Sequence, residues 1–125
     1  MKKMLAMAMA LAVCVSAWAA PAYVELKPQF VVNYGEGSRL RYLKAEVTLR
    51  TRDPMSAHEI HKHADYLRHE LVLLLSRQTV QTVSTAEGKE ALRDAALKAV
   101  QEVLLRETGQ VLVDQVLFTN FIVQR

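Results

Sequence analysis

The chain has 125 residues, of which 51% are hydrophobic and 23% are charged, and its formal net charge is +3. This length suits one domain, since single cores typically contain about 100–150 residues. The charged residues are spread along the chain instead of lying in blocks, which excludes a disordered protein. No Gly-x-Ser-x-Gly sequence or phosphate-binding glycine loop is present, so the common hydrolase and nucleotide-binding motifs are excluded.

The first residues predict a leader for export. Lys2 and Lys3 precede an uncharged run over residues 4–15, and Ala17-Trp18-Ala19 has the small-x-small pattern of a signal peptidase site. We therefore expect a signal peptide over residues 1–19. The alternative is an uncleaved membrane anchor to about residue 24, because a bilayer span needs about 17–25 apolar residues.

Either form of the leader places residues 20–125 outside the cytoplasm, as a single periplasmic domain that is free or associated with the inner membrane. Cleavage would remove Lys2 and Lys3 and leave 14 basic against 13 acidic residues, a net charge of +1 that does not favour nucleic acid binding. It would also remove Cys14, the only cysteine, so the domain would have no thiol chemistry.

Two strands are expected first. The segment 30–34 reads as a short strand with Phe30, Val32 and Tyr34 on one face, and a glycine-rich turn follows at 35–38. In the segment 43–49 the odd positions are apolar and the even positions polar, which predicts a strand with one buried face. A sheet covered on one side only is typical of antiparallel strands in α+β proteins.

Two helices and a last strand follow. Asp53-Pro54 begins a predicted helix that runs to about Arg77, and Ser84 with Glu87 fits a capping box for a second helix that ends near Gly109. Residues 111–124 are rich in β-branched and aromatic side chains and predict a central strand or one with a bulge. The predicted fold is α+β, with a small antiparallel sheet, two helices packed on one face, and the order strand, strand, helix, helix, strand.

The only cluster of metal-ligand residue types is formed by histidines at 58, 61 and 63. His58, His61 and Asp65 lie close to one helical face, so they could hold a transition metal, and a small periplasmic metal-binding protein is the alternative function. The metalloprotease spacing is absent because position 62 is Lys. We favour a solvated helix face and expect no catalytic residues, no cofactor and no structural metal.

A partner surface is expected at Phe118 and Phe121. These residues are three apart, so in a regular strand their rings face opposite sides of the sheet and one ring lies outside the core. An exposed aromatic ring is a natural contact for self-association. Which ring faces outward stays open, because a bulge between Val116 and Asn120 would change the alternation.

Five segments resemble, in order, the periplasmic domain of the FliL family of flagellar proteins. They lie at 30–34 (FVVNY), 41–49 (RYLKAEVTL), 73–76 (LLLS), 84–89 with Leu92 (STAEGK) and 116–124 (VLFTNFIVQ). The resemblance implies a domain similar to the stomatin-type fold, which self-associates beside the ion-driven stator units of the flagellar motor. It further implies a non-enzymatic basal-body accessory protein that supports motility, with a stator or basal-body protein as its partner.

Overall fold

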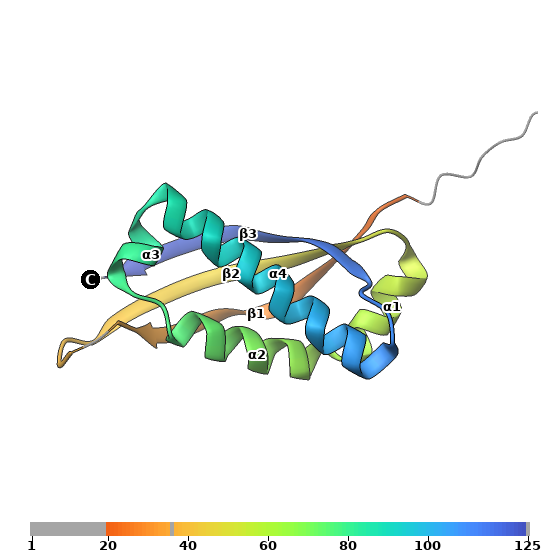
Figure 1. Ribbon diagram of the computed structural model, residues 1–125, viewed down its shortest axis with the longest axis horizontal. Coiled ribbons are helices and arrows are strands. Elements are labelled where there is room, and N and C mark those ends of the chain that lie inside the picture. Colours follow the sequence, from red (N-terminus) through yellow and green to blue (C-terminus); the bar gives the residue numbers. More distant parts are fainter. Residues whose placement is uncertain (1–19, 36, 125) are drawn as a thin grey trace, which may run out of the picture.

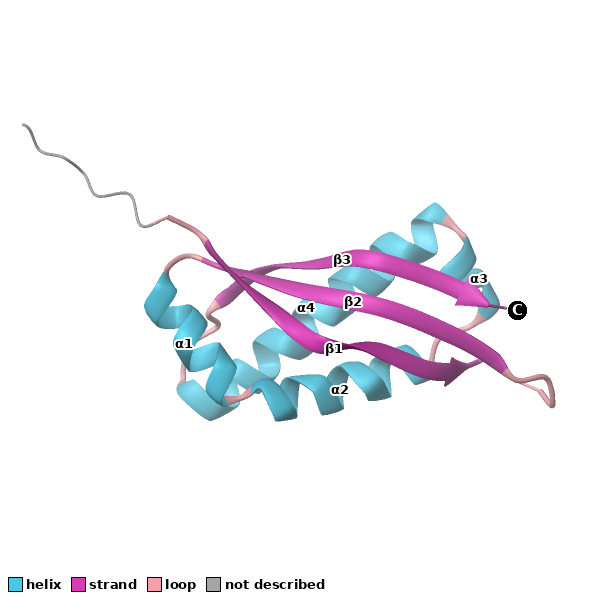
Figure 2. Ribbon diagram, turned by 180° about the vertical axis from the view of Figure 1, so that it is seen from behind, coloured by secondary structure: helices cyan, strands magenta, loops and turns pink. Residues whose placement is uncertain are grey.

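The computed structural model describes residues 20–35 and 37–124, so the predicted leader lies outside the described residues. Three strands form one antiparallel sheet in the order β1-β2-β3, with β1 at Ala22–Tyr34, β2 at Arg41–Thr51 and β3 at Val113–Gln124. The helices are α1 (Pro54–Lys62), α2 (Ala64–Ser76), α3 (Val80–Ser84) and α4 (Ala86–Thr108). Figure 1 shows the helices together on one face of the sheet, and Figure 2 shows the opposite face uncovered. The predicted α+β class is confirmed.

The core lies between the sheet and the helices. Strand β2 contributes every second residue, as the alternation predicted, and these side chains are at most 1% exposed: Leu43, Ala45, Val47 and Leu49. The helices contribute apolar residues at spacings of three and four, among them Leu67, Leu71 and Leu75 from α2 and Ala96, Val100 and Leu104 from α4. Within residues 20–35 and 37–124, no helix is long and apolar enough to cross a membrane.

The first predicted helix is two helices. The side chain of Asp53 caps α1 as expected, accepting a hydrogen bond from the Ser56 N–H at 2.7 Å. The chain then leaves helical geometry at His63 (φ −108°, ψ 14°), whose N–H bonds to the carbonyl of Ile60, three residues back. This tight turn separates α1 from α2, and the continuous apolar spacing of the sequence did not reveal it.

The predicted cap of the long helix was wrong by one residue. Ser84 ends the short helix α3, and Thr85 caps α4 by accepting a hydrogen bond from the Gly88 N–H at 3.0 Å. Gly88 is required where α3 meets α4, because a Cβ there would lie 2.5 Å from the Thr82 carbonyl oxygen. Gly109 ends α4 in the left-handed conformation (φ 78°), as predicted.

Both outer strands are irregular, and β3 is an edge strand instead of the central strand that its apolar character favoured. Strand β1 begins at Ala22, eight residues before the predicted start, and its register with β2 shifts between Leu26 and Phe30. Strand β3 has the predicted bulge: Phe118 pairs with Val47 and Asn120 pairs with Glu46, which leaves Thr119 between them.

Candidate interaction surface

The uncovered face of the sheet has a hollow centred on Glu46. Glu46 lies in β2 between two bulges, one in each neighbouring strand. Residues 27–29 form the bulge in β1, and Thr119 forms the bulge in β3. Bulges bend a strand and increase its local twist. The resulting hollow has a volume of about 710 Å³ and is lined by Glu25, Leu26, Lys27, Pro28, Gln29, Glu46, Val47, Thr48 and Thr119.

The hollow is accessible and carries charged and hydroxyl side chains among its lining residues. The Thr119 hydroxyl lies 3.4 Å from a carboxylate oxygen of Glu46, and the Lys27 ammonium lies 3.1 Å from the carboxylate of Glu25. The Glu25–Lys27 ion pair is largely exposed, and such pairs add little to stability. These side chains can therefore exchange their internal contacts for contacts with a partner.

An apolar patch lies beside the hollow on the same face. Val31 pairs with Lys44, which pairs with Ile122, so these three residues form one row across the sheet. Tyr42 lies two residues before Lys44 in β2 and faces the same side. Val31 is 53% exposed, Ile122 44% and Tyr42 38%. A hollow with charged side chains beside exposed apolar side chains is consistent with a protein contact surface.

The structure corrects the geometry expected of the two phenylalanines. Phe118 pairs with Val47 and Phe121 with Ala45, both of which are buried, so both rings lie on the face that the helices cover. Thr119 is the cause, because the extra residue reverses the alternation between the two positions. The rings meet edge to face with centroids 5.6 Å apart.

The two rings are half-buried at the open edge of the sheet and not in the centre of the core. The Lys89 ammonium of α4 lies 5.7 Å from the centroid of the Phe121 ring. The prediction that one ring lies on the uncovered face is therefore wrong. Their role as a partner contact stays a prediction, since both rings are accessible from the edge.

The histidine cluster is divided by the helix break. His58 and His61 belong to α1, whereas Asp65 belongs to α2 beyond the turn at His63. In residues 20–35 and 37–124, no three His, Cys, Asp or Glu side chains are grouped so that they could hold a metal ion. Nearby, Glu59 forms an ion pair with Lys62, whose hydrogen bond and charge lower the pKa of Glu59. No contact in the structure favours metal binding here.

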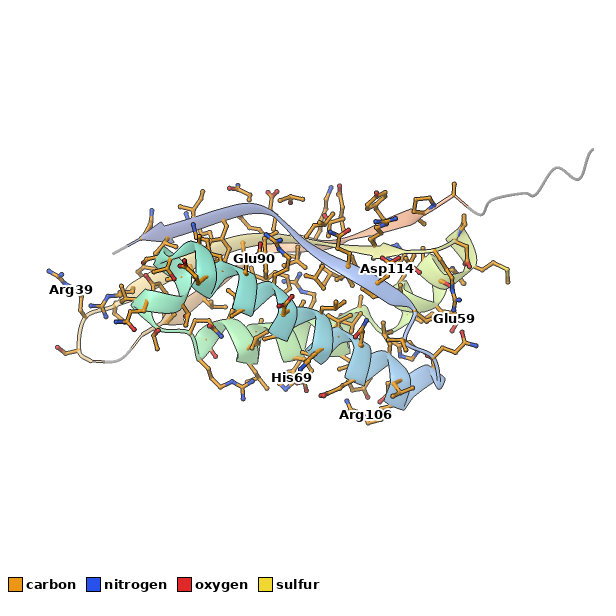
Figure 3. All side chains as sticks on the ribbon, turned by 45° about the horizontal axis from the view of Figure 1, so that its top comes forward. Arg39, Glu59, His69, Glu90, Arg106 and Asp114 are labelled. Carbon is orange, nitrogen blue, oxygen red and sulfur yellow. The ribbon has the colours of Figure 1, made fainter. Side chains whose placement is uncertain are left out.

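Sequence reasoning did not find the hollow. Its one sequence sign is Lys27-Pro28 in the middle of a strand, because proline inside a strand is confined to edges and bulges. Figure 3 shows the labelled charged side chains dispersed over the surface, with Asp114 on β3 near the α1 end and Glu90 on α4. The arrangement as a whole defines a small α+β domain, with helices on one face of the sheet and an accessible second face.

Comparison with known proteins identifies the family of the chain. A family model described as "Flagellar basal body-associated protein FliL" matches residues 23–124. The flagellar protein FliL of Aquifex aeolicus is 29% identical over 100 residues, which cover 80% of this chain and 60% of that protein. The flagellar protein FliL of Escherichia coli K12 is 30% identical over 95 residues, which cover 76% of this chain and 60% of that protein.

The chain belongs to the FliL family of flagellar basal body-associated proteins. The family is one of flagellar accessory proteins. The matched region spans about 60% of the length of these two relatives.

Proposed function

We propose that this chain is a non-enzymatic accessory protein of the flagellar motor that self-associates and supports the stator units in motility. Membership of the FliL family supports the flagellar setting. The observation that carries the contact function is the uncovered sheet face, where the hollow at Glu46 lies beside the exposed side chains of Val31, Tyr42 and Ile122. We assign the stator or basal-body partner to this face.

The proposed location is the periplasm, with association with the inner membrane. The lysines and apolar run of the leader support export. A domain held at the membrane surface would have its helix layer and its uncovered sheet face available for different contacts. Self-association through the sheet edge would then leave the uncovered face accessible to a stator unit.

The test is motility of a deletion strain complemented with point variants. The unmodified gene should restore swimming and swarming, and Glu46→Lys should not, because it places a cation in the partner hollow. Lys98→Ala on the exposed side of α4 is the matched control and should complement fully. Immunoblots and the circular dichroism of the purified variants must show equal amounts of folded protein. Normal motility of the deletion strain would refute the motor role, and full complementation by Glu46→Lys would refute the assigned face.

A further inference from the structure

The two edges of the sheet differ in how they are protected against pairing with another strand. Both edge strands have register shifts, but the β1 edge also carries a proline at position 28 and the charged side chains of Glu25 and Lys27, which are usual protections of an edge. The β3 edge has no proline, and Asp114 is its only charged residue between Val113 and Gln124. Strand β3 is therefore the edge suited to strand addition.

The sequence of β3 is complementary to itself in antiparallel register. When two copies of β3 are placed antiparallel about a twofold centre between Thr119 and Asn120, residues of the same type face each other in every pair. From the centre outward the pairs are Phe118 with Phe121, Leu117 with Ile122, Val116 with Val123, and Gln115 with Gln124. Cross-strand pairs of aromatic and branched apolar side chains are the main stabilising contacts between neighbouring strands.

The bulge at Thr119 makes this pairing consistent with the faces of the sheet. Residues opposite each other in an antiparallel pair point to the same side. In a regular strand Phe118 and Phe121 would point to opposite sides, and the matched pairs could not form. With the extra residue, both phenylalanines and both valines face the helix layer, since their partners in β2 are buried. Leu117 and Ile122 both face the open side, opposite Thr48 and Lys44.

We propose that two copies of the chain join by pairing β3 with β3 in antiparallel register, about a twofold axis between Thr119 and Asn120. The product is a continuous six-stranded sheet with both helix layers on one side. The contact is isologous, so every pair occurs twice. It covers the half-buried rings of Phe118 and Phe121 and leaves the hollow at Glu46 accessible. This inference rests on the self-association proposed above and specifies its surface.

Disulfide trapping between two different single-cysteine variants tests the register. Leu117→Cys and Ile122→Cys are made in the full chain with Cys14→Ser, and both lie on the open face outside the buried core. Directly opposed residues have Cα atoms about 4.5–5.5 Å apart, within the range of a disulfide. An equimolar mixture under oxidation should form at least tenfold more covalent dimer than either variant alone. The identical cysteines of one variant would lie about five residues apart along the strands, roughly 17 Å.

Val31→Cys, on the open face of β1, is the matched control, because its side chain is as accessible but far from the β3 edge. It should give only background dimer with either variant. Equal yields in all mixtures, or no disulfide between positions 117 and 122, would overturn the β3 pairing. Sedimentation of the full chain separates the two proposals. Oligomers without that disulfide would refute only the β3 surface, whereas a monomer up to several hundred micromolar would refute self-association itself.

Discussion

The guanidinium of Arg68 lies over the ring of Phe30, with its central carbon 4.3 Å from the ring centroid. The same side chain donates a hydrogen bond of 2.7 Å to the carbonyl oxygen of Pro28. One residue of α2 thus contacts both a core residue of β1 and the backbone of the β1 bulge. Because residues 25–29 line the hollow at Glu46, Arg68 supports that surface from the helix side.

Replacing Arg68 by Ala should lower the free energy of unfolding by about 1–2 kcal/mol, since it removes one cation–π contact and one charge-assisted hydrogen bond. Urea unfolding monitored by circular dichroism measures the change. Lys98→Ala, on the exposed side of α4, should stay within about 0.5 kcal/mol of the unmodified chain. Equal stability of Arg68→Ala and the unmodified chain would mean that the bulge does not depend on this contact.

The cap of α1 predicts a loss of stability in acid. The Ser56 N–H, which bonds to the carboxylate, lowers the pKa of Asp53 below its ordinary value of 3.8. A carboxyl with a lower pKa in the folded state stabilises the fold above its unfolded-state pKa, and this contribution is lost as pH falls through the folded-state pKa.

Urea midpoints measured from pH 7 to pH 2.5 should therefore fall less steeply below pH 4 for Asp53→Asn than for the unmodified chain. Asparagine retains the capping oxygen but does not titrate. Glu59→Gln is a comparison, because the pKa of Glu59 is also lowered. Removing this carboxyl should likewise make the urea midpoint fall less steeply in acid. Parallel curves for Asp53→Asn and the unmodified chain would contradict the capping role of the ionised carboxylate.

Gly88→Ala should destabilise the protein by about 1–3 kcal/mol, although alanine favours helices over glycine. The added methyl would lie 2.5 Å from the Thr82 carbonyl oxygen and push α3 away from α4. Thermal unfolding provides the measurement. Ala91→Gly, at an exposed position in the next turn, gives the cost of helix propensity alone, about 1 kcal/mol. A stabilised Gly88→Ala variant would show that the junction relaxes freely.

Phe118→Ala and Phe121→Ala should both lower stability, by about 2–3 kcal/mol each, because both rings lie on the helix-covered face and are half-buried. The edge-to-face contact between them predicts a coupling energy of about 0.5–1.5 kcal/mol in a double-mutant cycle. In a regular strand, where one ring would lie outside the core, only one of the two substitutions would lower stability. Additive effects would mean that the rings do not interact.

The leader prediction is tested by intact mass spectrometry of protein from its native host. Cleavage after Ala19 gives a mature chain that begins at Ala20 and is recovered from the periplasmic fraction. A chain that begins at Met1 or Lys2 in the membrane fraction would instead establish the anchor. Replacement of Ala17 and Ala19 by larger residues should block cleavage of the leader. Replacement of Ala20 and Ala22 is the control and should leave cleavage unchanged.

The elements that sequence predicted well are those in which one pattern dominates. Strict alternation in β2 identified its buried face, and Asp53 and Gly109 identified helix ends through local hydrogen bonds and backbone geometry. The break at His63 was not predicted because apolar residues at Ile60 and Leu67 continue the helical spacing across it. Local patterns do not contain the tertiary packing that decides where a helix is interrupted.

The candidate surface was predicted less well because it depends on register. A bulge had been foreseen in β3, but its position decides which face each later side chain occupies. The hollow needs a second bulge in β1 at the same level of β2, which only the pairing of three strands reveals. Family resemblance rested on the core segments and therefore predicted the fold better than the contact surface.

Thr119 is an extra residue in β3, and the bulge that accommodates it keeps the later side chains on their faces of the sheet. Many residues could occupy the position, because an unpaired bulge residue is held mainly by the backbone. A chain that lacked Thr119 would keep Phe121 and Val123 on the helix-covered face in a regular strand, because Phe118 and Phe121 would then be two positions apart. A strand that kept Thr119 without the bulge would instead place Phe121 and Val123 on the solvent side. Among relatives with this architecture, we therefore expect either two residues with a bulge or one residue in a regular strand between the positions of Phe118 and Phe121.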